Sequence, residues 1–429
     1  MKMMEETFQA AWQAIGGEAL QQPLWLINSL QHYDWGTIDV LPWLLGIENP
    51  QQQPQAEVWV GAHPKAPSQV VFPDAQFSLE QLIDGQPHAI LGARAIQRFG
   101  PKLPFLFKIL SAKKALSIQV HPDLAQAQAG FAHENAIGVP LTAAERNYHD
   151  ANHKPELLYA LTPFVGLVGF RPIPEIVRLL VLVGEHQLLT WAKRLQKEGE
   201  MALAAFYSWL LLLSGKELDH LLSAAGPSLQ FQHEPAFAEV QRLAQEHPGD
   251  SGILSPLVLN LVSLVPGEAM FIPAGTPHAY LRGTGVEVMA SSDNVLRAGL
   301  TQKHIAPDEL LSTVIFRSMT PEIMRQPANK QSVNKQPMNQ IEQRFPVPVD
   351  DFELSILRLQ SGDTFPVGLL PEVELLFCLK GTITLTNAQG EPWTLTPASS
   401  VLLPAASLGW QLCGHGKIAR VRIGPSLMH

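Results

Sequence analysis

The sequence predicts a mainly β protein with an α-helical insertion. Short apolar segments separated by Gly, Pro and Asn turns occupy residues 23–173 and recur after residue 256, which is typical of β-strands. Between them, residues 174–255 are rich in Leu, Ala, Glu and Gln, and their apolar positions follow the i, i+3, i+4 spacing of amphipathic helices. We therefore expect a helical domain inserted between strands of one β-domain.

The elements expected in the first half follow from local patterns. Residues 1–22 look amphipathic and predict a helical extension, to which no function is assigned. A helix is expected to start at Ser78, because Ser78-Leu-Glu-Gln81 has the Ser-x-x-Gln pattern of a capping box. The polar, Ala-rich stretch 123–149 predicts helix and loop. Strands are expected at residues 26–36, 56–62, 103–110, 115–120 and 155–170.

The second half begins with the helical insertion. Its periodicity predicts helices at residues 175–183, 186–213, 215–224 and 235–246. A β pattern resumes at residue 257 and continues to 290, and a short helix is expected at 309–314. Residues 325–345 are rich in Gln, Asn, Lys and Pro, which indicates a linker, and 346–429 read as strands and turns to the end.

Composition narrows the class of protein. The chain has 429 residues and a net charge of −9, which argues against nucleic acid or an anionic membrane as partner. Its two cysteines, Cys378 and Cys413, cannot make a disulfide framework and suit a reducing compartment. The N-terminus does not resemble a signal peptide, and the apolar run 201–213 is shorter than the ~20 residues that a membrane span needs. We expect a cytoplasmic protein.

The stretch from Pro266 to Tyr280 predicts two short strands joined by a tight turn. Pro273 and Gly275 bend the chain, since Pro restricts φ and Gly tolerates positive φ, and His278 follows the bend. The spacing resembles the second conserved motif of the cupin family of small β-barrels, in which the His is a metal ligand. A plain turn with a hydrogen-bonded His is the alternative interpretation.

Two further stretches favour a metal site. Gln119 and His121 alternate in a β pattern and so share one face of a strand, and Glu156 stands at the start of another apolar strand. With His278 they offer two imidazoles, one carboxylate and one amide oxygen. Such a set without thiolates suits Zn²⁺, and also Mn²⁺, Co²⁺ or Fe²⁺. Three strong ligands and a weak one leave room for substrate oxygens, as in a catalytic site.

Longer motifs resemble the type I mannose-6-phosphate isomerase (phosphomannose isomerase) family. In family order between residues 26 and 305, they are Tyr33-Asp-Trp-Gly36, Ala56-Glu-Val-Trp-Val-Gly-Ala-His-Pro64, Ser117-Ile-Gln-Val-His-Pro-Asp123, His153-Lys-Pro-Glu-Leu157, Pro277-His-Ala-Tyr-Leu281 and the stretch 286–303. One departure is Gln302, which stands where the family commonly has Pro.

The resemblance implies two cupin-like (jelly-roll) β-barrels plus a helical domain. The metal-binding catalytic barrel would comprise residues 23–173 and 256–324, the helical domain 174–255, and the second barrel 346–429. A weak internal repeat places Gly409 where His278 stands in the first barrel. The second barrel is therefore expected to lack the metal.

The resemblance also implies a function and a set of roles. The reaction would be the reversible isomerisation of mannose 6-phosphate and fructose 6-phosphate through a metal-stabilised enediolate, with proton transfer between C2 and C1. One Zn²⁺ per chain would be held by Gln119, His121, Glu156 and His278. The catalytic candidates are Arg297, Lys154, Glu287, Asp293 and His153. The substrate-binding candidates are Ser117, Lys108, Lys303, Tyr280 and Trp35.

The sequence leaves open which residue takes the C2 proton. A small sugar phosphate is the expected partner, and a monomer is the expected state. Two alternatives remain: another metal-cupin enzyme such as an iron oxygenase, and a sugar-binding cupin without catalysis. Gln119 and Glu156 argue against the two-His facial arrangement of such oxygenases. Arg297 beside a complete ligand set favours catalysis over binding alone.

Overall fold

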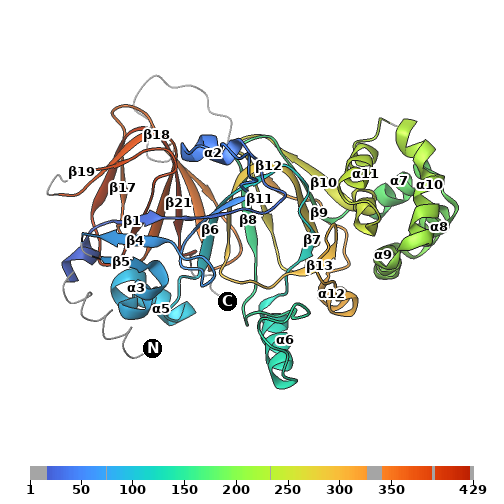
Figure 1. Cartoon of the computed structure of the whole chain (residues 1–429), viewed down its shortest axis with the longest axis horizontal. Coiled ribbons are helices and arrows are strands. Elements are labelled where there is room, and N and C mark those ends of the chain that lie inside the picture. Colours follow the sequence, from blue (N-terminus) through green and yellow to red (C-terminus); the bar gives the residue numbers. More distant parts are fainter. Residues whose placement is uncertain (1–16, 74, 232, 326–340, 389–391, 426–429) are drawn as a thin grey trace. The chain divides into compact units, whose positions relative to one another are not determined.

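A computed structural model describes residues 17–425, apart from residues 74, 232, 326–340 and 389–391 (Figure 1). Most of the expected N-terminal helix and most of the expected linker lie outside the described residues. The chain divides into two compact units, which are residues 1–110, 286–291 and 326–429, and residues 111–285 and 292–325. The mainly β character with a helical part is confirmed. The finer domain bounds and the jelly-roll assignment stay predictions.

The first unit contains a ten-stranded sheet in the order β15-β16-β21-β18-β20-β1-β4-β5, with β17 beside β21 and β19 beside β18. Its strands are β1 (Leu24–Ile27), β4 (Gln69–Phe72), β5 (Ala75–Ser78), β15 (Glu342–Phe345), β16 (Glu353–Leu359), β17 (Thr364–Val367), β18 (Glu374–Thr386), β19 (Pro392–Leu395), β20 (Ser400–Leu403) and β21 (Trp410–Arg422). β15 therefore begins inside the range expected as linker.

The same unit holds three more strands and several short helices. The strands β2 (Ser29–Gln31), β3 (Glu57–Val60) and β6 (Phe105–Ala112) pair in that order, with only the last two residues of β6 beyond the unit. The helices are η1 (Gly17–Gln21, a 3-10 helix), α2 (Val40–Leu45), α3 (Leu79–Gly85), α4 (Pro87–Leu91) and α5 (Ala93–Phe99).

Helix α3 confirms the capping box expected at Ser78. The Ser78 hydroxyl accepts a hydrogen bond from the Gln81 amide at 3.1 Å, and the Gln81 side chain accepts one from the Ser78 amide at 2.9 Å. Two amides that a helix start leaves without intrahelical partners are thus satisfied by side chains.

Replacing Ser78 with Ala should therefore lower the free energy of unfolding by about 0.5–2 kcal/mol, the usual value for a lost N-cap. Urea unfolding followed by circular dichroism measures it. Ser223→Ala is the control, because Ser223 is exposed within helix α10 (Gly215–Phe231) and Ala has the higher helix propensity. Equal stabilities of Ser78→Ala and wild type would contradict the role of this cap.

The second unit is built around the long strand β12 (His278–Ala290), whose last residues continue into the first unit. β8 pairs with both β11 and β12, β9 pairs with β10 and β12, and β7 pairs with β12 and β13. The bounds are β7 (Ile118–Val120), β8 (Glu156–Ala160), β9 (Phe164–Phe170), β10 (Leu259–Leu264), β11 (Ala269–Ile272), β13 (Leu296–Gly299) and β14 (Ile323–Met324).

Helices lie between β9 and β10 in the chain and cluster together (Figure 1). They are α7 (Ile173–Val183), α8 (His186–Glu198), η2 (Gly199–Ala202), α9 (Leu203–Leu212), α10, α11 (Pro235–Glu246) and η3 (Ser251–Leu257). They share a hydrophobic core with the strands, where Phe170 meets Tyr207 edge-on with ring centroids 5.1 Å apart. Two other helices, α6 (Leu124–Ala136) and α12 (Pro307–Thr313), complete the unit.

The single helix expected over residues 186–213 is wrong. The structure has α8 and α9 with a short 3-10 segment between them. Gly199 ends α8 with φ of +63° and ψ of −140°, a backbone conformation that Gly adopts without steric cost because it lacks a Cβ. The apolar periodicity continues through this break, so it does not reveal the break. No helix in the described part of the chain is long and apolar enough to cross a membrane.

Candidate metal centre

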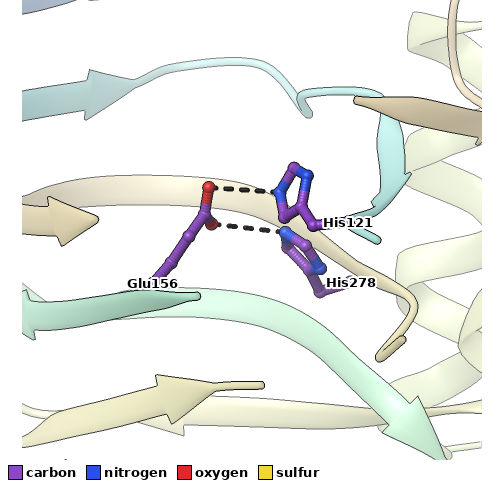
Figure 2. Close-up of side chains that lie close together, drawn as sticks. All are labelled: His121, Glu156 and His278. Atoms are coloured by element: carbon purple, nitrogen blue, oxygen red, sulfur yellow. Dashed lines mark ion pairs between the residues drawn. The ribbon is translucent and has the colours of Figure 1, made fainter. Parts of the chain in front are cut away.

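Three side chains at the ends of different strands meet inside the second unit (Figure 2). His121 follows β7 directly, Glu156 begins β8 and His278 begins β12. Each offers one ligand atom, and these three atoms lie within 4.8 Å of one another. Strand pairing brings them together, because β12 pairs with both β7 and β8.

The distances within this cluster suit one small cation. His121 Nε2 lies 3.1 Å from Glu156 Oε1, and His278 Nε2 lies 3.4 Å from Glu156 Oε2. Figure 2 shows the carboxylate facing both rings. Two atoms that bind the same tetrahedral Zn²⁺ at ~2.1 Å lie about 3.4 Å apart. The two observed separations, which involve the two different oxygens of Glu156, are close to that value. Since one atom from each of the three residues lies within 4.8 Å of the others, the residues can hold such an ion together.

The other nitrogen of each ring is held by a main-chain carbonyl. His121 Nδ1 lies 2.7 Å from the Asn294 oxygen, and His278 Nδ1 lies 2.9 Å from the Thr276 oxygen. A carbonyl only accepts, so each Nδ1 carries a proton, and each Nε2 is the ring nitrogen that faces Glu156 and is placed to bind a metal. Among the described residues, the buried Nε2 of His121 has no partner in hydrogen-bonding geometry. Both rings are therefore oriented as metal ligands.

The electrostatics of the cluster point the same way. His121, Glu156 and His278 are 2%, 3% and 3% exposed. Burial lowers the pKa of His121 to about 4, so its ring is neutral at neutral pH. Burial opposes ionisation of Glu156, but the Lys154 ammonium 3.5 Å away favours the anion, and the pKa of Glu156 is held well below its usual range. A neutral imidazole beside a carboxylate anion suits a divalent cation.

Gln119, the fourth ligand expected from the sequence, lies on β7 two residues before His121. It is directly opposite His278 on β12 and opposite Arg297 on β13. Its side-chain amide nitrogen donates to the Ser117 hydroxyl at 3.3 Å. The backbone thus places Gln119 beside a residue of the cluster, and its role as a ligand stays a prediction.

Two more predicted residues contact Glu156. The Lys154 ammonium is buried and lies 3.5 Å from Glu156 Oε1. The buried Tyr280 hydroxyl donates to Glu156 Oε2 at 3.3 Å. Arg297 is half-buried, and burial lowers its pKa, although a guanidinium remains charged in proteins. A cation and a hydroxyl therefore surround the carboxylate.

The remaining candidates in this unit lie on loops. His153 precedes Lys154 and is half-buried, as are Asp293 and Ser117, whereas Lys303 is exposed. The Asp293 amide donates to Asp150 Oδ2 at 2.7 Å, and the Lys303 amide donates to a Thr301 hydroxyl at 3.1 Å. These positions leave their catalytic or substrate-binding roles as predictions.

Three predicted residues belong to the first unit. Lys108 Nζ lies 3.6 Å from Glu57 Oε1 and 3.4 Å from Glu287 Oε2, and all three side chains are buried. The structure thus brings Lys108 and Glu287 together in one charge cluster, which their separation in the sequence does not reveal. Trp35 stacks on Tyr33 with ring centroids 5.7 Å apart.

Sequence reasoning missed Asn294. It lies inside the stretch 286–303 that resembles the family, but no local pattern in the sequence indicates a role for it. The structure buries it fully and uses its main-chain oxygen to hold His121. Its position beside the predicted Asp293 and near Arg297 was the only indication of a role. Its partners could not be predicted, because they are distant in the chain.

Comparisons of the sequence with known proteins match one enzyme family. Residues 24–173 match the family model described as phosphomannose isomerase type I, catalytic domain. The chain is 44% identical over 399 residues to the mannose-6-phosphate isomerase of Escherichia coli (strain K12), covering 92% of this chain and 98% of that one. It is 34% identical over 401 residues to the human mannose-6-phosphate isomerase, covering 86% and 89%.

Solved structures give the same result. A mutant of phosphomannose isomerase from Salmonella typhimurium matches with a TM-score of 0.85 and 40% identity, over 94% of this chain and 100% of that one. A zinc-bound mannose 6-phosphate isomerase matches with a TM-score of 0.85 and 41% identity, over the same shares of the two chains.

Proposed function

The chain belongs to the mannose-6-phosphate isomerase family, and we propose that it interconverts mannose 6-phosphate and fructose 6-phosphate with one Zn²⁺ held by His121, Glu156 and His278. The observation that carries this proposal is the buried cluster of two imidazoles and one carboxylate. Zinc is chosen because a similar solved isomerase contains it and the ligand spacing suits it. Gln119 is proposed as the fourth ligand.

The reaction moves one proton between C2 and C1 of the open-chain sugar, through an enediolate. When bound, Zn²⁺ supplies Lewis acidity toward the carbonyl and hydroxyl oxygens of the sugar. The chain must then provide a group that takes the proton from one carbon and returns it to the other. Lys154 is our candidate, because its buried ammonium lies 3.5 Å from a proposed ligand. Glu287, Asp293 and His153 are the other acid/base candidates.

Substrate binding requires cationic and hydroxyl donors for the phosphate and the sugar. Arg297 is proposed to hold negative charge, because it keeps a permanent cation opposite Gln119 in the β7–β13 pair. Ser117, Lys108 and Lys303 remain candidates for phosphate, and Tyr280 and Trp35 for the pocket wall. We also propose that the protein acts as a cytoplasmic monomer.

The direct test supplies the purified protein with Zn²⁺ and mannose 6-phosphate and follows fructose 6-phosphate by NMR. We expect conversion without any co-reactant, and the same final ratio of the two sugars when fructose 6-phosphate is the starting compound. Binding of mannose 6-phosphate without conversion would indicate a sugar-binding protein instead. Oxygen consumption with Fe²⁺, in place of isomerisation, would indicate an oxygenase.

A further inference from the structure

We propose that Asn294 is a positioning residue that sets the affinity of the metal site. Its main-chain carbonyl orients His121, and its side chain holds the loop that leads into Glu156. The inference rests on the metal site of the proposed function. Asn294 itself is not a ligand. It would act by positioning two proposed ligands, His121 and Glu156.

The side chain of Asn294 is fully buried, and its bonds to described residues all go to one loop, residues 149–152. Its Nδ2 donates to the main-chain oxygens of Asp150 at 2.8 Å and Asn152 at 2.9 Å. Its Oδ1 accepts from the amide of His149 at 2.7 Å. The amide group thus uses its donors and its acceptor on the same loop, which only Asn or Gln chemistry permits.

The main chain of Asn294 faces His121, one of the proposed metal ligands. Its oxygen accepts the Nδ1 proton of His121 at 2.7 Å, across 173 residues of sequence. On the loop side, Asn152 is followed after three residues by Glu156, the first residue of β8. Asn294 therefore orients the ring of His121 and anchors the chain just before Glu156.

Asp150 makes an amide at position 294 necessary. Asp150 Oδ1 accepts from the Asn152 amide and the Ser292 hydroxyl, both at 2.9 Å, and lies 3.3 Å from Asn294 Nδ2. Asp150 Oδ2 accepts from the Asp293 amide at 2.7 Å. An Asp at position 294 would lose the donors to the loop and place a second carboxylate against Asp150. Such like charges repel each other, and position 294 is fully buried whereas Asp150 is half-buried.

Loss of the hydrogen bonds between the Asn294 side chain and residues 149–152 should affect the affinity for the metal more than the rate of the catalysed step. If the His121 ring or the first residue of β8, Glu156, becomes free to move, metal binding must also order them. The free energy of binding the ion then becomes less favourable by that amount. Groups that orient metal ligands typically contribute 10–100-fold to metal affinity. Once the ion is bound at saturation, the same ligands surround it, so most of the activity should return.

The experiment compares Asn294→Asp with Asn49→Asp as a matched control. Asn49 has the same bonding pattern in the first unit, since its Nδ2 donates to the oxygens of Ile38 at 2.9 Å and Gln53 at 2.8 Å and its Oδ1 accepts from the Gln53 amide. The Kd for Zn²⁺ is measured by competition with a chromophoric chelator. We expect it to rise about 10–100-fold in Asn294→Asp and to stay unchanged in Asn49→Asp.

A second readout separates positioning from simple destabilisation. Saturating Zn²⁺ should restore most of the kcat of Asn294→Asp, with the KM for mannose 6-phosphate close to that of the wild type. Ser292→Ala provides a milder variant, which keeps the Asn294 side chain and loses the hydroxyl that bonds Asp150, the Asn152 oxygen and the Asn294 amide. A smaller rise in Kd is expected. An unchanged zinc Kd in both folded variants would overturn the inference. Failure of the wild type to bind Zn²⁺ would instead overturn the proposed function.

Discussion

Replacing His278 with Ala is expected to abolish tight zinc binding and to lower kcat/KM by about 10³-fold, because the site loses one of its two imidazoles. Lewis-acid stabilisation by a bound ion contributes several kcal/mol. A loss of ~4 kcal/mol corresponds to about three orders of magnitude in rate. The measurements are the zinc content of the purified variant and the steady-state rate with mannose 6-phosphate.

The control for this variant is His133→Ala, since His133 is exposed on helix α6. Chelation should abolish turnover of the wild type and of His133→Ala, and added Zn²⁺ should restore both. Added Zn²⁺ should restore His278→Ala only weakly. A His278→Ala protein with full zinc content and full turnover would contradict the metal centre.

Replacing Lys154 with Met should lower kcat by about 10²–10⁴-fold, the usual contribution of a positioned general acid or base. Met has a similar length and no charge, so the variant removes the ammonium while filling much of its buried volume. The variant should still bind Zn²⁺, because His121, Glu156 and His278 are unchanged. The decisive comparison is kcat at saturating Zn²⁺ and saturating mannose 6-phosphate.

Lys114→Met serves as the control, because Lys114 is exposed between β6 and β7 and should not affect kcat. If Lys154→Met retains a kcat near that of the wild type, Lys154 is not the proton-transfer group. The same measurement on Glu287→Gln, Asp293→Asn and His153→Gln would then identify it among the remaining candidates.

Features that depend on residues close together in the sequence could be predicted from it. The capping box at Ser78 was predictable because both partners lie within one helical turn. The β-period placed Gln119 and His121 on one face, and the turn at Pro273 and Gly275 placed His278 after a bend. Periodicity also located the helices, but it missed the break at Gly199, where the backbone conformation of one residue interrupts a continuous apolar pattern.

The sequence by itself therefore determined the kinds of element, the family resemblance and the residues able to bind a metal. Only the tertiary structure decided that His121 and His278 both face Glu156, at 3.1 and 3.4 Å. It also decided that burial keeps His121 neutral and that Asn294 holds its ring. The physical reason is that strand pairing across more than a hundred residues creates these contacts. The same packing excludes water, so the pKa of His121 depends on neighbours that are distant in the chain.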